Sequence, residues 1–387
     1  MNFVYLSPQF PPHFYRFCVE LARQGVQVFG IGDAPLEQLR PELREALADY
    51  YQVNSLHDED QVRRACGYFV WRHGKIDRIE SHIEIWLTLE AVMREDFNMI
   101  GPKIPQTDIF RRKSKMKEVF RGAGIPVADG ELFRDRAHTE AFIKRVGYPI
   151  IAKPDIGVGG QDTFRIEGSN DIDRFLSQKP SVDYFLEAFV FGDLFTFDGI
   201  TDQQGNMVYH TSHTSATGVL ELVVDNVDLS YYSLREIPET LRSYGEKSVA
   251  AFGIREKFFH FEFWKEHKTG RYIAMELNCR PPGGYTTDIM NYSADIDVYR
   301  EWANVIVRNR FESGVKRKYH CAHVARRFEK SYRLSHEEIL AQYGANIAFA
   351  SEVPLIFAPV MGNMCYLVRS EEESEIRKMI LAIQEKA

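Results

Sequence analysis

Apolar residues along the first hundred positions occur in short runs that alternate with amphipathic stretches. The short runs predict strands at residues 3–7, 26–31, 50–53 and 76–79. The amphipathic stretches predict helices at residues 12–24, 58–72 and 84–97. Strands that alternate with helices predict a parallel, doubly wound α/β domain over residues 1–103.

The pattern changes after residues 101–105, where Gly and two Pro interrupt it. Helices are predicted at residues 107–122, 237–252 and 297–309. Short strands rich in β-branched or aromatic residues are predicted at 148–154, 163–166, 184–190, 195–200 and 207–212. We therefore expect an α+β domain over 104–310, built from parts 104–186 and 187–310, and a mixed α/β cap over 311–387.

Residues 258–284 predict two strands joined by a polar turn, with functional side chains on one face. Glu276, Asn278 and Arg280 alternate with apolar residues and therefore share a face. A turn centred near Lys268 places Glu262 opposite or nearly opposite Glu276. Two facing carboxylates repel unless a cation lies between them, and Mg²⁺ is a cation that prefers oxygen ligands. The alternative is a solvated hairpin, which the aromatic residues of the opposite face disfavour.

Composition narrows the class of protein. The chain has 387 residues and a net charge of −7, which argues against a nucleic-acid partner. The N-terminus shows no signal-peptide pattern, and no apolar run reaches membrane-spanning length. The five cysteines are scattered, as expected for free thiols in a reducing compartment. We therefore expect a cytoplasmic protein with no membrane partner.

Two basic positions precede this hairpin in the sequence. Lys153 ends the apolar run YPIIAK, and the Gly-rich loop 154–162 follows it. Glycines let backbone N–H groups approach phosphate oxygens closely. Lys113 lies on a basic helical run. Each feature alone is weak, because a Gly-rich turn and a solvated helix face are common.

The order of these features resembles the ATP-grasp superfamily of carboxylate–amine ligases, whose ATP-binding fold biotin carboxylase and carbamoyl phosphate synthase share. A helical Lys is followed by a strand ending in Lys, a Gly-rich loop, the segment Glu187–Val190, and then Glu262 and Glu276-x-Asn278-x-Arg280. The resemblance covers about residues 105–310. It also extends to the α/β domain that precedes the grasp domain.

The resemblance implies roles residue by residue. ATP and Mg²⁺ are the implied cofactors, with two metal ions for which Mn²⁺ is a substitute. The nucleotide would be held by Lys113, Lys153, Gly157, Gly159, Gly160, Glu187, Ala188, Phe189 and Val190. The metals would be held by Glu262, Glu276 and Asn278. The catalytic residues would be Arg280, Lys153 and Asn278.

One position departs from the family pattern. Much of the family has a ribose-binding acid seven residues beyond the position of Glu187, and here that position is Leu194. The adjacent Asp193 is the candidate substitute.

The implied activity is an ATP-dependent ligase. It would phosphorylate a substrate carboxylate to an acyl phosphate and couple it to an amine, releasing ADP and phosphate. The partners would be small-molecule carboxylates and amines, with a homodimer as one option. The alternatives are a bicarbonate-phosphorylating enzyme and a non-catalytic ATP-binding module.

Substrate contacts are expected from the residues that follow Arg280 and from nearby strands. The candidates are Gly283, Gly284, Asp288 and His210. A plain turn and a helix N-cap are the alternatives at the first three. His213 is three residues from His210, so the two histidines face opposite sides of a strand. Further candidates, with solvated positions as the alternative, are Glu80, Glu84, His323, Arg326 and Arg327.

Overall fold

The N-terminal part of the protein is a four-stranded parallel sheet. The structure is a computed structural model that describes residues 1–215 and 228–387. The sheet order is β3 (Asp49–Gln52), β2 (Gln27–Gly32), β1 (Asn2–Leu6) and β4 (Arg78–Glu80). Its main helices are α1 (Tyr15–Arg23), α2 (Pro41–Ala46), α3 (Glu59–His73) and α4 (Leu87–Asp96). The parallel pairing confirms the α/β prediction for this region.

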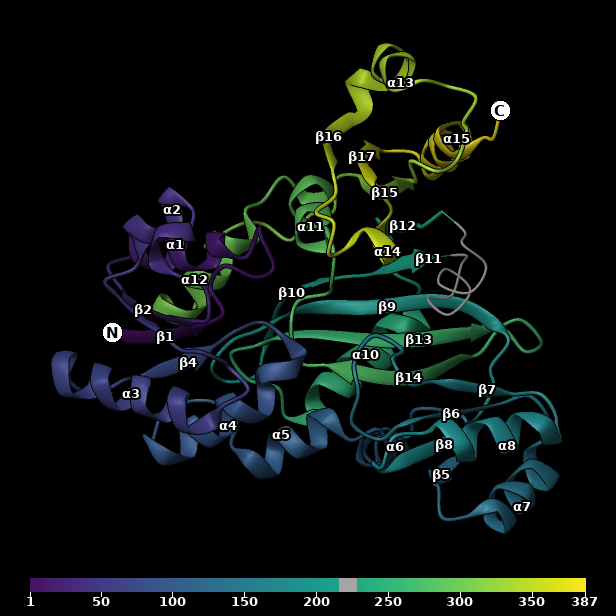
Figure 1. The fold of residues 1–387 in the computed structure, drawn as a ribbon. Coiled ribbons are helices and arrows are strands. Elements are labelled where there is room, and N and C mark those ends of the chain that lie inside the picture. The colour runs from purple at the N-terminus through teal and green to yellow at the C-terminus, as the bar shows by residue number, and fades with distance from the viewer. Residues whose placement is uncertain (216–227) are drawn as a thin grey trace.

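A small antiparallel sheet follows in the sequence. Its order is β5 (Gly130–Leu132), β8 (Tyr184–Ala188), β6 (Ile150–Pro154) and β7 (Phe164–Ile166). Helices α7 (Arg136–Val146) and α8 (Ser169–Gln178) pack on it through a core that includes Phe142 and Phe175. Figure 1 shows this unit below the large sheet.

Within residues 1–215 and 228–387, the largest sheet joins nine strands. Its order is β14 (Tyr272–Asn278), β13 (Phe258–Glu266), β9 (Gly192–Thr201), β11 (His213–Ser215), β12 (Ser230–Ser233), β15 (His320–Arg326), β17 (Met364–Ser370) and β16 (Ile347–Glu352), with β10 (Met207–Thr211) on β9. The last three strands come from the predicted C-terminal cap, which therefore continues the sheet. The domain boundaries stay predictions.

Helices cover the large sheet and link it to the rest of the chain (Figure 1). They are α5 (Ile104–Arg111), α6 (Lys113–Gly122), α10 (Glu239–Phe252), α11 (Thr286–Ala294), α12 (Val298–Arg308), α13 (His336–Tyr343), α14 (Ala358–Met361) and α15 (Glu373–Gln384). Helix α12 packs against α1, and Trp302 lies in one core with Phe17 of the parallel sheet's helix layer.

The prediction of a single helix over residues 107–122 was wrong at one residue, because the structure has two helices there. Arg112 is extended and separates α5 from α6. The Asp155 carboxylate accepts hydrogen bonds from the Ser114 backbone N–H at 2.8 Å and from the Ser114 hydroxyl at 3.0 Å. The Lys113 N–H donates to the Asp155 carbonyl at 2.9 Å. These bonds satisfy donors that a new helix start leaves free.

The predicted hairpin is confirmed, together with its register. Glu262 of β13 is directly opposite Glu276 of β14, and His260 is opposite Asn278. The other face of β13 is fully buried at Phe259, Phe261 and Phe263. The alternation therefore leaves the acids on one side and core on the other.

Two features bear on the protein's environment. Within residues 1–215 and 228–387, no helix combines the length and apolar character needed to cross a bilayer. The cysteines are all buried and unpaired.

Candidate active site

A cavity of about 450 Å³ lies between the small sheet and the large sheet. Helix α6, strands β6 and β8, and strands β13 and β14 supply its walls. Nearly all the predicted nucleotide and metal residues line it. They are Lys113, Lys153, Gly157, Gly159, Gly160, Glu187, Ala188, Phe189, Val190, Glu262, Glu276, Asn278 and Arg280.

Glu187 is held between two lysines in this cavity. Lys153 Nζ lies 2.7 Å from Glu187 Oε2, and Lys117 forms a close ion pair with Oε1. Burial alone would raise the pKa of Glu187, but the ammonium groups of Lys117 and Lys153 outweigh it and lower the pKa to about 2. Sequence reasoning missed Lys117, which is hidden in the basic run. Its position four residues after Lys113 is the helical spacing that could have revealed it.

Cationic side chains of the protein partly compensate the negative charges of Glu262 and Glu276. Lys113 Nζ lies 3.9 Å from Glu276 Oε2, and His260 Nε2 lies 3.0 Å from Glu262 Oε1. Burial raises the pKa of Glu276, yet Lys113 and Lys153 lower it overall, so this group is a carboxylate. Asn278 adds an amide oxygen and donates to Glu276 at 3.4 Å.

This donor set fits Mg²⁺. Two carboxylates and an amide oxygen are hard ligands, and Mg²⁺ commonly completes its shell with water and substrate phosphates. Among the described residues, no three His, Cys, Asp or Glu side chains form a metal-binding group. A metal at Glu262 and Glu276 therefore depends on additional ligands such as phosphate oxygens.

Arg280, which follows the metal-binding candidates in the sequence, contacts an acid of the N-terminal part of the chain. Its Nε lies 3.7 Å from Glu84 Oε2, and Arg111 Nε lies 3.9 Å from the other Glu84 oxygen. Glu84 is buried, so a solvated position is excluded. Glu80 is also buried, but both its oxygens accept from Lys257 at 2.7 and 2.5 Å. Glu84 therefore contacts the cavity residue Arg280, whereas Glu80 ties the parallel sheet to Lys257, which directly precedes β13.

The Gly-rich loop is anchored at its start and free of close packing at its middle. Lys113 Nζ donates to the Gly157 carbonyl at 3.3 Å. Gly159 and Gly160 have φ values of +66° and +72°, which side-chain-bearing residues rarely adopt. No atom lies within 4 Å of where their Cβ atoms would be. This geometry suits a loop that folds over a ligand.

Part of the cavity lining is apolar and aromatic. Phe189 packs under the Arg165 guanidinium at 4.7 Å and against Phe191 at 4.7 Å between centroids. Ile151 and Met275 contribute further apolar lining. A planar heterocycle fits such a slot, with the adjacent backbone supplying polar contacts.

Asp193 is not brought to the cavity. Alternation along β9 turns Leu194 toward the site, where it lines the cavity, and turns Asp193 to the opposite face. The Asp193 carboxylate instead lies 3.1 Å from His267 Nε2 at an exposed position. The predicted replacement for the ribose-binding acid is therefore not supported by its position.

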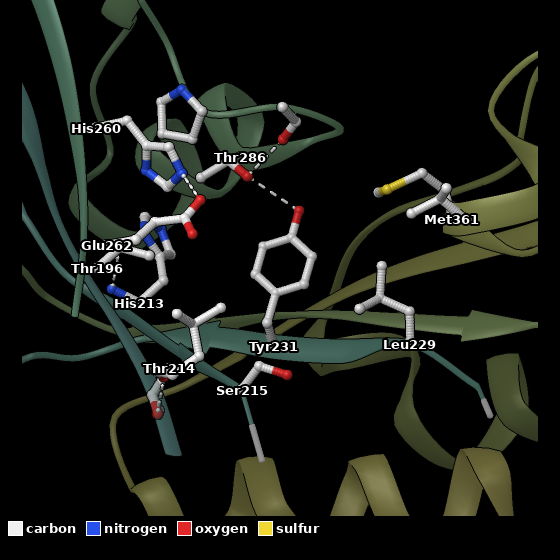
Figure 2. A pocket seen from close by; sticks show the side chains of 14 residues that line it. Thr196, His213, Thr214, Ser215, Leu229, Tyr231, His260, Glu262, Thr286 and Met361 are labelled. Carbon is white, nitrogen blue, oxygen red and sulfur yellow. Dashed lines mark hydrogen bonds and ion pairs between the residues drawn. The ribbon is translucent and has the colours of Figure 1, made fainter. Parts of the chain in front are cut away.

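A second cavity of about 190 Å³ adjoins the first and shares Glu262 and Leu194 with it. Figure 2 shows His213, His260 and Glu262 on one side and Leu229 and Met361 on the other. The described residues that line it are Leu194, Thr196, His213, Thr214, Ser215, Leu229, Tyr231, His260, Glu262, Pro282, Gly283, Thr286, Val360 and Met361.

A buried carboxylate organises the histidines of this second cavity. Asp198 is fully buried and lies 2.5 Å from His260 Nδ1 and 2.7 Å from His213 Nδ1. Burial lowers the pKa of His260, but Asp198 and Glu262 outweigh it and raise the pKa to about 9. His260 therefore carries positive charge between two carboxylates at neutral pH. Sequence reasoning missed Asp198, because its partners come from other strands.

Of the four predicted substrate residues, one lines the second cavity and the other three have other contacts. Gly283 lines the second cavity, and Gly284 has φ of +62° with Met361 against its Cβ position. Asp288 is neither a free acid nor an N-cap, since it accepts from Arg16 at 2.8 Å. His210 lines neither cavity and stacks on Phe197 at 5.8 Å.

The candidate clamp of the C-terminal part does not form. Arg326 donates to the carbonyls of Ile383 and Leu334, at 2.5 and 2.7 Å, and Arg327 donates to Pro359 at 3.0 Å. Both guanidinium groups therefore bind backbone carbonyls, and neither belongs to a basic surface patch. His323 is buried beside Cys365.

Comparison with known proteins gives matches in sequence and in structure. No protein-family profile matches the chain. It is 24% identical over 251 residues to the L-arginine-specific L-amino acid ligase of Bacillus subtilis, covering 60% of this chain and 58% of that protein. It is 24% identical over 196 residues to the carbamoyl phosphate synthase large chain of Thermotoga sp. (strain RQ2), covering 47% of this chain and 17% of that protein. The chain thus spans less than two thirds of both relatives.

Solved structures match nearly the whole chain. The L-amino acid ligase from Bacillus licheniformis superposes with a TM-score of 0.75 at 15% identity, covering 98% of this chain and 95% of that one. The biotin carboxylase domain of Hydrogenobacter thermophilus 2-oxoglutarate carboxylase, a dimer with MgADP, ADP and bicarbonate, gives 0.72 at 15% identity, covering 100% and 90%. The protein therefore has the ATP-grasp fold, and its similarities are to ATP-dependent ligases of that fold.

Proposed function

We propose that the protein is an ATP-dependent ligase that phosphorylates a small-molecule carboxylate and couples it to an amine. One observation carries this proposal. Three groups of different chemistry converge on one cavity: the lysines Lys113 and Lys153, the facing acids Glu262 and Glu276, and the guanidinium of Arg280. Nucleotide binding alone does not need an arginine beyond the metal ligands.

In this proposal the nucleotide lies with its base in the apolar slot at Phe189. Lys113 and Lys153 contact its phosphates, because both ammonium groups line the cavity near Glu276. Lys117 neutralises Glu187 and so positions this carboxylate for the base edge. Ribose contacts come from residues other than Asp193.

Glu262, Glu276 and Asn278 would hold Mg²⁺, as one or two ions, with Mn²⁺ as a substitute. When bound, the metal neutralises negative charge on the transferring phosphoryl group. Arg280 orients the phosphoryl group and then stabilises the tetrahedral oxyanion that forms when the amine attacks. The Glu84 carboxylate, whose Oε2 lies 3.7 Å from Arg280 Nε, positions the guanidinium. Closure of the loop at Gly159 and Gly160 excludes water from the acyl phosphate.

Assembly and location are also part of the proposal. The dimeric biotin carboxylase neighbour supports a homodimer. The buried, unpaired cysteines support a reducing compartment such as the cytoplasm.

A second candidate is a bicarbonate-phosphorylating enzyme. It is favoured by the neighbour that was solved with bicarbonate and by the carbamoyl phosphate synthase match. Its expected signature is release of ADP that depends on bicarbonate. The second cavity, of about 190 Å³, favours a larger organic substrate instead.

The test is a phosphate-release screen of carboxylates and amines, singly and in pairs, with Mg-ATP. For an active pair, the carboxylate is then labelled with ¹⁸O. An acyl phosphate passes one labelled oxygen to the released phosphate, and this transfer is the expected result. Release without label would exclude the acyl phosphate, and binding of ATP without any turnover would favour the non-catalytic module.

A further inference from the structure

The second cavity has one polar end and one apolar end. Among the described residues, its lining contains no Lys or Arg. The titratable groups among these described lining residues are His213, His260, Glu262 and Tyr231. A substrate carboxylate would therefore find no cation here other than a histidine and would face Glu262, whereas Arg280 lines the first cavity.

Among the residues that the structure describes, one ring nitrogen of His213 has no hydrogen-bond partner. Its Nδ1 lies 2.7 Å from Asp198 Oδ2, and Asp198 is a carboxylate, so Nδ1 carries the proton and donates it. In the neutral imidazole Nε2 is then an acceptor. His213 is only 3% exposed, and its Nε2 has no hydrogen-bond partner within residues 1–215 and 228–387. Leaving a buried acceptor unpaired costs free energy, which a hydrogen bond from a ligand N–H would recover.

The other titratable groups of the lining are already engaged. Both ring nitrogens of His260 face carboxylates, at 2.5 and 3.0 Å. Glu262 is bonded to His260. The Tyr231 hydroxyl is bonded to Thr286 at 3.0 Å, and burial raises its pKa. Within the described lining, His213 Nε2 is therefore the proton acceptor that remains available.

We propose that the second cavity binds the amine substrate and that His213 Nε2 takes the proton from the attacking nitrogen. This rests on the proposed ligase function. The amine nitrogen forms a bond to the acyl carbon, and the bond from that carbon to the phosphate oxygen breaks. Nε2 takes one proton from the bound ammonium, which frees the lone pair that attacks. Phosphate leaves with the electron pair of the broken bond and accepts the second proton that the nitrogen loses. Asp198 stabilises the imidazolium that forms, as an acid behind a histidine does in other acyl-transfer sites.

The apolar end defines the class of amine. Leu229, Val360 and Met361 line it, and Figure 2 shows Tyr231 between this end and the histidines. An acidic side chain would be desolvated there without a partner, which is costly. The cavity therefore fits an amine with a small, uncharged and apolar side chain.

The test compares two nucleophiles in His213→Gln. Hydroxylamine is a free base at neutral pH and traps the acyl phosphate as a hydroxamate, whereas an ordinary alkylamine must lose a proton to attack. We expect the variant to keep hydroxamate formation within about threefold and to lose about 10²–10⁴-fold in amide formation. His320→Gln is the control, because His320 lies outside both cavities and bonds the Ser233 carbonyl at 3.0 Å.

Equal losses with both nucleophiles in folded His213→Gln would overturn the proposal, and so would unchanged amide formation. Absence of hydroxamate in the wild-type protein would instead contradict the ligase function itself. If the Gln variant does not fold, the shorter His213→Asn is compared in the same way. In the wild-type protein, amines with apolar side chains should react at least about tenfold faster than those with acidic side chains, and the reverse order would contradict the assignment.

Discussion

At the scale of single residues, the site depends on buried side chains whose opposite charges compensate one another. Glu187 lies between Lys117 and Lys153, and all three side chains are at least nine-tenths buried. Removing one charge leaves the others without compensation in a region of low dielectric. Such a loss typically costs about 3–5 kcal/mol.

We therefore predict that Glu187→Gln lowers the free energy of unfolding by about 3–5 kcal/mol at neutral pH, measured by urea denaturation. The folded pKa of Glu187 is lowered from 4.5 to about 2, so its stabilisation is complete above the unfolded pKa. It is lost as pH falls through the window from 4.5 to about 2. The difference between variant and wild type should therefore shrink in that window.

Glu167→Gln is the matched control for this prediction. Glu167 is an exposed acid whose side chain is 60% accessible and pairs with Arg165. Its substitution should change stability by less than about 1 kcal/mol. Equal effects of the two substitutions would refute the buried triad.

Residue-scale prediction from sequence succeeded where the signal was local. The facing of Glu262 and Glu276 follows from alternation and turn length, and the structure has that register. Asp198 and His213 could not be paired in this way, because they lie on neighbouring strands whose order no local pattern reveals. Lys117 was equally hidden, because its partner Glu187 lies on the small sheet.

At the scale of elements, α10 lies close against the large sheet because Gly245 has no side chain. A Cβ at this position would meet the ring of Phe197, which is fully buried. Gly in a helix lowers stability by about 1 kcal/mol relative to Ala. Close packing against Phe197 therefore explains why position 245 is a glycine.

We predict that Gly245→Ala destabilises the protein by about 1–3 kcal/mol, because overpacking exceeds the gain in helix propensity. Gly122→Ala is the control: Gly122 ends α6 and has no atom within 4 Å of its Cβ position. This control should be neutral or slightly stabilising. Thermal denaturation of both variants checks the difference, and stabilisation by both would contradict the packing argument.

The Gly-rich loop gives a second prediction for an element. Ala at Gly159 and Gly160 would have to adopt positive φ, at a cost of about 1–2 kcal/mol per residue. The double substitution should weaken ATP binding at least about tenfold, measured by calorimetry. Gly168→Ala is the control, because Gly168 is extended and unpacked. Unchanged affinity in the double variant would show that this loop does not contact the nucleotide.

Elements were predictable where amphipathic periodicity was uninterrupted, as in α3 and α10. Between residues 122 and 184 the sequence predicted only the strands at 148–154 and 163–166, so α7 and α8 were missed. Both helices are stabilised mainly by packing on the small sheet, through Phe142 and Phe175. The break at Arg112 depends on Asp155, 43 residues away in sequence, and no local signal marks it.

At the scale of the whole molecule, one sheet connects the candidate site to the C-terminal part. Strand β15 pairs with β12, and β12 pairs with β11, which carries His213. Val360 and Met361 then return to line the second cavity. The boundary predicted at 310/311 divides this sheet, and it is not expected to separate independently folding units.

We predict that truncation after residue 310 exposes the edge of β12 and the apolar face of the lost strands. The shortened protein should aggregate on size-exclusion chromatography, and the full chain should not. A soluble, monodisperse fragment that keeps wild-type ATP binding would contradict this coupling.

The central claim is that the facing acids and the lysines form a site for a metal-bound nucleotide. Calorimetric titration with a non-hydrolysable ATP analogue, with and without Mg²⁺, tests it most directly. We expect Mg²⁺ to strengthen wild-type binding about 10–100-fold, and Glu276→Gln to abolish this gain. Glu266→Gln, on the same hairpin but bonded to Thr269, should retain it. Binding that is equally tight with and without Mg²⁺, or unchanged in Glu276→Gln, would contradict the account.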